Sequence, residues 1–192
     1  MRKTLYIHGL SSSGSSNTVS ILRNLLPKEK IIAPDLPIDP FKALSLLHQI
    51  CNKEHPNIII GTSMGGMFAQ QLYGYKKILV NPAFHVSSFM RKNKGVQSFF
   101  NERKDGIMTY EITEKLCNSY ADLEADQFKG ITPFDIENTY GLFGSNDDLV
   151  NCTDEYLLHY NHYLYFEGGH RLNRQNIEKD ILPLIEYLVS KD

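Results

Sequence analysis

Short apolar runs alternate with amphipathic stretches along most of this chain. The runs are about four residues long and rich in isoleucine, leucine, valine and tyrosine, as expected of buried strands. The stretches between them carry apolar residues three and four positions apart, which indicates helices that pack one face against a core. Six strands are predicted in this way, at residues 4–7, 30–33, 57–60, 77–80, 139–143 and 163–166.

The helical stretches have recognisable positions and ends. Apolar residues mark one helix at 19–26, a second from Pro40 to the residues before Pro56, and a closing helix at 177–188. Strands that alternate with helices imply right-handed crossovers and a mainly parallel sheet covered on both faces. We therefore predict an α/β fold in which residues 1–192 form a single domain.

One segment interrupts this alternation. Residues 84–134, between the fourth and fifth predicted strands, are rich in charged and aromatic side chains. Ligands bind outside the carboxyl ends of the strands in an open parallel sheet, so an insertion at this point would overhang the binding edge. We expect a helical insertion that acts either as a lid or as an ordinary packing layer or dimer contact.

Composition narrows the classes of partner and cofactor. The chain has 20 basic and 22 acidic residues and a formal net charge of -2, so it lacks the broad positive field of a nucleic-acid-binding protein or a polybasic membrane anchor. Its cysteines, at positions 51, 117 and 152, have no C-x-x-C spacing, which argues against a disulfide framework or a zinc site. We expect a small-molecule partner, and neither a metal nor an organic cofactor.

The start of the chain bears on its location. The first apolar stretch ends at His8-Gly9, which makes it too short for the core of a signal peptide. No run approaches the roughly 18 apolar residues of a membrane-spanning helix. We expect a cytoplasmic protein that does not enter a membrane, with a homodimer as one option for its assembly.

A serine stands where the third predicted strand meets the following helix. Ser63 lies in Gly61-Thr62-Ser63-Met64-Gly65, a G-x-S-x-G sequence that follows an apolar run and opens a helical pattern. A nucleophile elbow needs this context, because a serine at a sharp strand-to-helix turn requires small residues two positions before and after it. A tight structural turn is the alternative, and a P-loop is disfavoured because no lysine follows Gly65. We predict that Ser63 is a catalytic nucleophile.

A serine nucleophile needs a base and a carboxylate, each at the carboxyl end of a strand. His170 follows the sixth predicted strand and is the preferred base, the alternative being a turn histidine that caps the last helix. Asp147 and Asp148 follow the fifth strand, which gives the order Ser, Asp, His along the chain. We favour Asp147 as the acid, because Asp148 would then point outward or cap the next helix; turn formation alone would also account for either aspartate.

Two backbone N–H groups normally stabilise the oxyanion in such a site. Met64 follows the serine at the positive end of a helix, and Leu10 lies in the loop after the first strand, where Gly9 permits a tight turn. The N–H groups of Leu10 and Met64 are therefore the predicted donors. His8 is expected to support this loop through hydrogen bonds to nearby backbone rather than to transfer protons.

The walls of the site are less well marked in the sequence. Leu10, Met64, Met67 and Phe84 could line an apolar acyl pocket, although apolar residues at these places are also typical of core. The serine-rich loop at 11–16 either contacts a polar substrate or only caps the helix that follows it. We predict Leu10, Met67 and Phe84 as substrate-binding residues.

Four segments together resemble a known family. They are YIHGLSSS at 6–13, APDL at 33–36, GTSMGG at 61–66 and LVNPA at 79–83. They look like the small bacterial esterases of the YqiA/YcfP family, also called UPF0227, within the α/β-hydrolase superfamily. The resemblance spans nearly the whole chain, and the Asn-Pro-Ala segment is more specific than the G-x-S-x-G sequence.

The resemblance implies an α/β-hydrolase fold with a minimal, mostly parallel sheet of about six strands. It also implies a serine hydrolase that cleaves carboxylic esters with short acyl chains. A thioesterase or acyltransferase would use the same triad, and a non-catalytic ligand-binding module could stand on the same scaffold. The presence of Ser63, Asp147 and His170 at the expected strand ends argues for catalysis.

Overall fold

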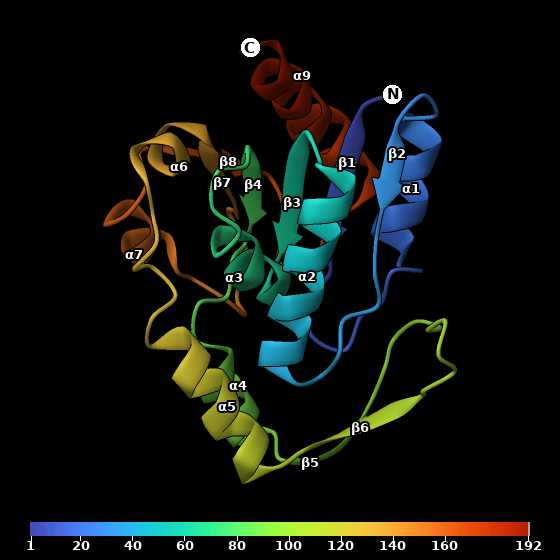
Figure 1. The fold of residues 1–192 in the computed structure, drawn as a ribbon, viewed down its shortest axis with the longest axis vertical. Coiled ribbons are helices and arrows are strands. Elements are labelled where there is room, and N and C mark those ends of the chain that lie inside the picture. The colour runs from blue at the N-terminus through green and yellow to red at the C-terminus, as the bar shows by residue number, and fades with distance from the viewer. Residues whose placement is uncertain (192) are drawn as a thin grey trace.

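The computed structural model describes residues 1–191, and in this part of the chain the centre is a six-stranded parallel sheet (Figure 1). The strand order is β2-β1-β3-β4-β7-β8, so the direction of chain progress reverses between β1 and β3. All six predicted strands are present, with ends shifted by at most two residues. Their bounds are β1 (Lys3–Ile7), β2 (Lys30–Ile32), β3 (Ile58–Thr62), β4 (Lys77–Val80), β7 (Thr139–Gly144) and β8 (His162–Phe166).

One face of the sheet is covered by the first helix and the C-terminal helical segment. Val19 and Leu22 of α1 pack in one buried cluster with Ile185 of the last helix and with sheet residues such as Ile58 and Ile60. The closing helix is predicted correctly, although its first part is a π-helical turn. These elements are α1 (Asn17–Leu25), α8 (Arg174–Asn176), the turn η1 (Ile177–Ile181) and α9 (Leu182–Ser190).

The opposite face carries the second buried cluster, in which Leu47 of α2 and Phe68 of α3 pack on Ile59 and Leu79 of the sheet. Helix α2 begins at Pro40, as predicted, because the Asp39 carboxylate accepts a hydrogen bond from the Lys42 N–H at 2.9 Å. The elements on this side are α2 (Pro40–Glu54), α3 (Met64–Gln70), α6 (Pro133–Asn138) and α7 (Thr153–Leu157).

The insertion after β4 lies beyond the carboxyl ends of the strands (Figure 1). It contains α4 (Val86–Lys92), β5 (Gly95–Ser98), β6 (Thr109–Ile112) and α5 (Glu114–Glu124). Strands β5 and β6 form an antiparallel pair, so the expectation of a helical insertion is wrong for this part. Each of these strands has only four residues and buries alternate side chains at most, a pattern too short to stand out in the sequence.

Hydrogen bonds join this hairpin to the loops that follow β1 and β2. Asp35 accepts from the N–H of Gly14 and from the N–H of Lys104, both at 2.7 Å. The Phe100 N–H donates to the Ser11 carbonyl at 2.8 Å. The insertion is therefore bonded to these loops through its hairpin, in addition to its connections to β4 and α6.

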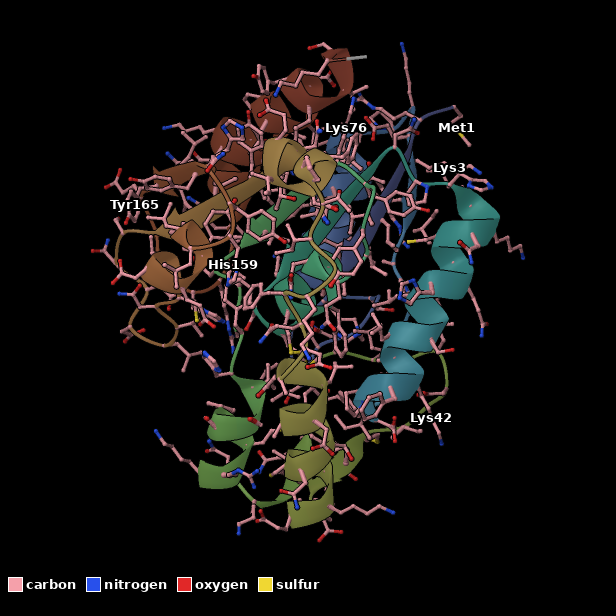
Figure 2. All side chains as sticks on the ribbon, turned by 60° about the vertical axis from the view of Figure 1, so that its left-hand side comes forward. Met1, Lys3, Lys42, Lys76, His159 and Tyr165 are labelled. Atoms are coloured by element: carbon pink, nitrogen blue, oxygen red, sulfur yellow. The ribbon has the colours of Figure 1, made fainter. Side chains whose placement is uncertain are left out.

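The two ends of the sheet are easily told apart. In Figure 2, Lys3 and Lys76 mark the amino ends of strands, and Lys42 marks the opposite end of the molecule, on the side of the insertion. Tyr165 points outward from the edge strand β8, where it is 61% exposed. Within residues 1–191, no helix has both the length and the apolar character needed to cross a bilayer.

Candidate active site

Ser63 occupies the sharp turn from β3 into α3. Its φ of 54° and ψ of -122° lie where a residue with a side chain is strained. Backbone hydrogen bonds hold the turn: the Ser63 N–H donates to Val80, and the Ser63 carbonyl accepts from Gly66 and Ala83. Strain that the surrounding structure maintains in this way exposes the serine hydroxyl at the end of the sheet.

The glycines on either side of the serine are required by close packing. A Cβ added to Gly61 would lie 2.3 Å from the Gly65 carbonyl oxygen, and a Cβ added to Gly65 would lie 2.0 Å from the carbonyl oxygen of Ile7. Both distances are well inside van der Waals contact. The small residues of the G-x-S-x-G sequence are therefore needed for the geometry that the sequence predicted.

A chain of hydrogen bonds runs from Ser63 to an aspartate. The Nε2 atom of His170 lies 3.0 Å from Ser63 Oγ, and its Nδ1 atom lies 2.7 Å from Asp147 Oδ2. The other carboxylate oxygen of Asp147 accepts from the N–H groups of residues 149–150, and the side chain is only 4% exposed. Asp148 is exposed to solvent, so the structure places Asp147 and not Asp148 beside His170.

Asn81 fixes the loop that carries the histidine. Its amide Nδ2 donates to the carbonyls of Gly169 and His170, at 3.1 and 3.2 Å, and its Oδ1 accepts from the Gly144 N–H at 2.7 Å. Asn81 has a φ of 42°, which asparagine tolerates better than most residues. One buried side chain thus joins the ends of β4 and β7 to the His170 loop. The sequence marked this asparagine as part of a motif but gave it no role.

His8 supports the loop after β1, as predicted. Its Nε2 accepts from the Leu36 N–H at 3.1 Å, which leaves the proton on Nδ1 for donation to the Gly9 carbonyl at 2.8 Å. Burial lowers the pKa of His8, so the ring stays neutral. Gly9 itself packs closely on the nucleophile, since a Cβ there would be 3.2 Å from Ser63 Cβ.

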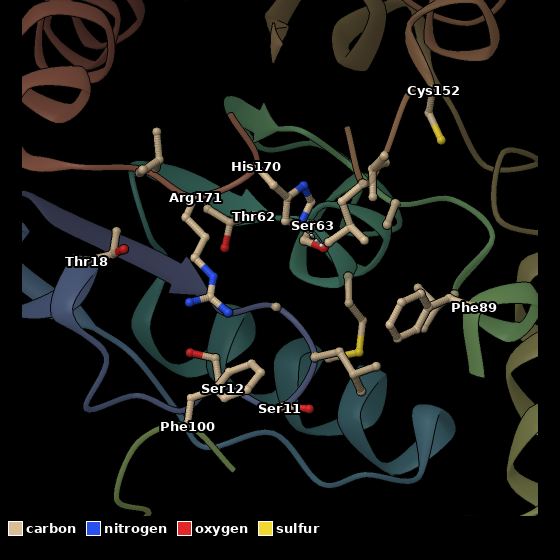
Figure 3. A pocket seen from close by; sticks show the side chains of 18 of the residues that line it. Ser11, Ser12, Thr18, Thr62, Ser63, Phe89, Phe100, Cys152, His170 and Arg171 are labelled. Carbon is tan, nitrogen blue, oxygen red and sulfur yellow. Dashed lines mark hydrogen bonds between the residues drawn. The ribbon is translucent and has the colours of Figure 1, made fainter. Parts of the chain in front are cut away.

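A cavity of about 620 Å³ opens above Ser63, within the size range of small-molecule sites (Figure 3). The predicted oxyanion donors Leu10 and Met64 line it, and Met64 is the first residue of α3, whose N–H has no acceptor in its own helix. The insertion contributes His85, Val86, Phe89, Phe100 and Asn101. The other lining residues are Tyr6, Gly9, Ser11, Ser12, Asn17, Thr18, Thr62, Ser63, Ala83, Leu149, Val150, Asn151, Cys152, His170, Arg171 and Leu172.

Two predicted substrate-binding residues do not reach this cavity. Met67 lies one turn into α3 and is fully buried in the core, and Phe84 is fully buried against Phe128, with ring centroids 5.0 Å apart. Both belong to the structural core, which was the alternative that the sequence left open. Their places in the wall are taken by residues such as Phe89 and Leu149, whose exposure depends on how distant segments pack and has no local sequence signal.

His85 and the three cysteines form no bond to Ser63, although two of these residues line the cavity. His85 lines the cavity, but its Nε2 lies 2.7 Å from Glu155 and forms no bond to Ser63. Cys51 and Cys117 are buried free thiols, and Cys152 is a half-buried thiol at the cavity wall. Within residues 1–191, no group of three or more histidine, cysteine or acidic side chains is arranged to hold a metal ion.

The arrangement has a defined chemical capacity. Because the Asp147 carboxylate accepts the proton on His170 Nδ1, the Nε2 lone pair faces the Ser63 hydroxyl. Such an imidazole can remove the serine proton, and the carboxylate would stabilise the resulting positive charge. The geometry therefore suits attack by a serine on an electrophilic carbonyl.

Comparison with known proteins identifies a family and a fold. A family model described as "Uncharacterised protein family (UPF0227)" matches residues 3–182. Est1E from Butyrivibrio proteoclasticus is similar in structure, with a TM-score of 0.66 and 12% identity over 99% of this chain and 89% of that one.

Two further structures agree with this finding. One comes from LipS and LipT, two metagenome-derived lipolytic enzymes, with a TM-score of 0.67 and 13% identity over 99% of this chain and 94% of that one. The other is α/β-hydrolase domain-containing protein 10 from mouse, with a TM-score of 0.60 and 12% identity over 98% and 86%. At these identities the likeness establishes the α/β-hydrolase fold and a distant structural similarity to esterases and lipases.

Proposed function

Since this chain belongs to the UPF0227 family and has the α/β-hydrolase fold, we propose that it is a serine esterase that hydrolyses short-chain carboxylic esters. The observation that carries the proposal is the hydrogen-bonded series Ser63, His170 and Asp147 at the floor of the cavity. These residues are the nucleophile, the general base and the orienting acid.

The first half of the reaction forms an acyl-enzyme. His170 Nε2 takes the proton of Ser63 as Oγ attacks the ester carbonyl, and the N–H groups of Leu10 and Met64 hold the oxyanion of the tetrahedral intermediate. The intermediate then collapses, the bond between the carbonyl carbon and the alcohol oxygen breaks, and His170 gives its proton to the departing alcohol.

The second half releases the acid. Water loses a proton to His170 as it attacks the acyl-enzyme carbonyl, and the proton then returns to Ser63 Oγ when the carboxylic acid leaves. Asp147 keeps the imidazole in one orientation through both halves and stabilises its charged form.

The cavity supports a preference for small substrates. Its volume of about 620 Å³ is bounded on one side by Val86 and Phe89 from the insertion, which acts as a fixed cap over the serine in this proposal. In this proposal Val86 and Phe89 limit the length of the acyl chain that can lie beside Ser63. We expect activity to fall from the butyrate to the palmitate ester of p-nitrophenol.

The experiment that tests the proposal measures hydrolysis of p-nitrophenyl esters from acetate to palmitate. Ser63→Ala and His170→Ala should each lower kcat by at least about a thousandfold, because neither residue can be replaced by its neighbours. Ser119→Ala is the matched control: this half-buried serine on α5 bonds only the Lys115 carbonyl of its own helix, and the variant should behave as wild type. Folded wild type that neither turns over nor reacts at Ser63 with a fluorophosphonate would overturn the proposal.

A further inference from the structure

The cavity has two chemically different halves on either side of the serine. Figure 3 shows Arg171, Ser12 and Thr18 on one side of Ser63, and Phe89 and Cys152 on the other. The half with Phe89 is completed by apolar side chains from the loop after β7 and from the insertion. The half with Arg171 presents hydroxyl groups and a guanidinium.

Arg171 contacts an aromatic ring of the insertion and keeps its hydrogen-bond donors free. Its guanidinium carbon lies 5.0 Å from the centroid of the Phe100 ring, a cation–π contact that favours this position of the exposed head group. Among residues 1–191, no side chain or carbonyl accepts a hydrogen bond from it, and no carboxylate pairs with it. Its five N–H donors therefore point into solvent beside the proposed nucleophile.

No other side chain that lines the cavity neutralises the positive charge of Arg171. Within the described chain, the residues that line the cavity include no aspartate or glutamate. His85 is engaged by Glu155, and His170 by Asp147. An arginine without a partner in a cavity of small-molecule size favours an anionic ligand.

The first turn of α1 adds to the same half. Asn17 and Thr18, its first two residues, line the cavity. The N–H groups of a first helical turn have no acceptor in their own helix, and the Ser16 side chain forms no capping bond with them. The positive end of this nine-residue helix therefore faces the side of the cavity that holds Arg171.

Building on the serine esterase proposed above, we infer that the substrate carries a carboxylate that binds Arg171 beside the first turn of α1. The uncharged part of the ester then occupies the half that contains Phe89 and Cys152. The planar guanidinium can donate two parallel hydrogen bonds to a carboxylate, which would fix the register of the ester bond over Ser63.

The test compares esters that differ only in charge. For a carboxylate on the alcohol, the pair is 4-acetoxybenzoate and its methyl ester; for a carboxylate on the acid, the pair is 4-nitrophenyl hydrogen adipate and 4-nitrophenyl methyl adipate. The measured quantity is the ratio of kcat/KM for the anionic ester to that for the neutral one. In at least one pair, Arg171→Gln should lower this ratio about tenfold or more, as expected for lost charge-assisted hydrogen bonds.

Two further variants sharpen the result. Arg171→Lys keeps the charge but not the planar fork, so it should lower the ratio by less than Arg171→Gln. Arg174→Gln removes the same charge three residues away, where the arginine is bound to Glu178 and Asn24 outside the cavity, and should leave the ratio unchanged. A ratio unchanged by Arg171→Gln in both pairs, with Ser63-dependent hydrolysis present, overturns this inference and leaves the esterase proposal standing.

A binding measurement separates the two proposals. Titration calorimetry of 4-acetoxybenzoate and of 4-nitrophenyl hydrogen adipate into Ser63→Ala needs no turnover, and the affinity for at least one of them should fall about tenfold when Arg171→Gln is added. Loss of affinity supports the anion site even if no ester is hydrolysed, in which case only the esterase proposal fails. Equal affinity for both anionic esters with and without Arg171 overturns the anion site.

Discussion

Two polar groups of residues stand at opposite ends of the strands of the parallel sheet. At the carboxyl ends, Ser63, His170 and Asp147 open into a cavity. At the amino ends, Lys77 of β4 pairs with Asp135 at 2.7 Å, and both side chains are completely buried.

Asp147 and Asp135 are both held by hydrogen bonds from the backbone, but their partners, His170 and Lys77, differ in how close they lie to solvent. Asp147 accepts two backbone N–H groups, and Asp135 accepts the N–H of Gly74 together with the hydroxyl and N–H of Thr132. Lys77 donates to Asp135 and to the Leu72 carbonyl inside the protein, whereas His170 faces a hydroxyl that solvent can reach. Access to solvent therefore separates a group suited to chemistry from one that only stabilises the fold.

The largest effect should come from the acid of the open group. Asp147→Asn should lower kcat by about 10³–10⁴-fold, because an amide in this place favours the wrong tautomer of His170. Asp148→Asn, the adjacent and exposed control, should retain wild-type activity in the p-nitrophenyl acetate assay. Equal losses for the two variants would contradict the assignment of Asp147.

The closed group should affect stability instead of turnover. Lys77→Met should lower the free energy of unfolding by about 3–5 kcal/mol, because it leaves the Asp135 charge buried without its oppositely charged partner. Lys30→Met is a matched control at the first residue of β2, where the lysine is half-exposed and pairs with Glu54, and should cost less than about 1 kcal/mol. Urea titrations measure both free energies of unfolding. If the folded Lys77→Met protein also lost kcat, the buried pair would contribute to turnover and the contrast between the two groups would be wrong.

Asn81 follows β4 at the same end of the sheet as the open group, and it should affect the positioning of His170. Asn81→Gly removes the bonds to Gly169, His170 and Gly144 while it accommodates the positive φ, so the fold is spared. We expect kcat to fall about tenfold to a hundredfold with little change in KM, because His170 loses its orientation. A variant that loses stability but keeps kcat would show that Asn81 has only a structural role.

The smallest expected effect is the change in the free energy of unfolding at low pH. Burial raises the pKa of Asp135, but the bonds from Lys77 and Thr132 outweigh it and hold that pKa below its usual value of 3.8. The stability that Asp135 contributes is therefore present above this value and is lost as the pH falls through the lower, folded-state pKa. In urea titrations from about pH 6 to about pH 2, the gap between wild type and Asp135→Asn should narrow. A constant gap would mean that the pair is not ionised at neutral pH.

The sheet and the three central residues of the site were predictable for a local reason. A short apolar run in the sequence indicates each strand, and in a parallel sheet the residues just after the strands meet at one edge. Ser63, Asp147 and His170 each follow such a run, so their proximity could be expected without any knowledge of packing.

The cavity was not predictable in the same way, because it depends on contacts between distant segments. Met67 and Phe84 have the same apolar character as Phe89, and only the packing of the insertion decides which of them is exposed. In the sequence Arg171 looks like any surface arginine. Only the structure shows that it contacts the Phe100 ring and has no hydrogen-bond acceptor among the described residues.

The insertion is a continuous segment that contributes to the shape of the cavity but contains none of the three central residues of the site. Its two junctions are anchored to the body, through the Ala83 N–H on the Ser63 carbonyl and through Asp135 on Lys77. Ser63, His170 and Asp147 all lie outside it, while Val86 and Phe89 within it shape the cavity. Substitutions at the cavity-facing positions of this segment can therefore change which ligands fit without touching the residues proposed to carry out the reaction.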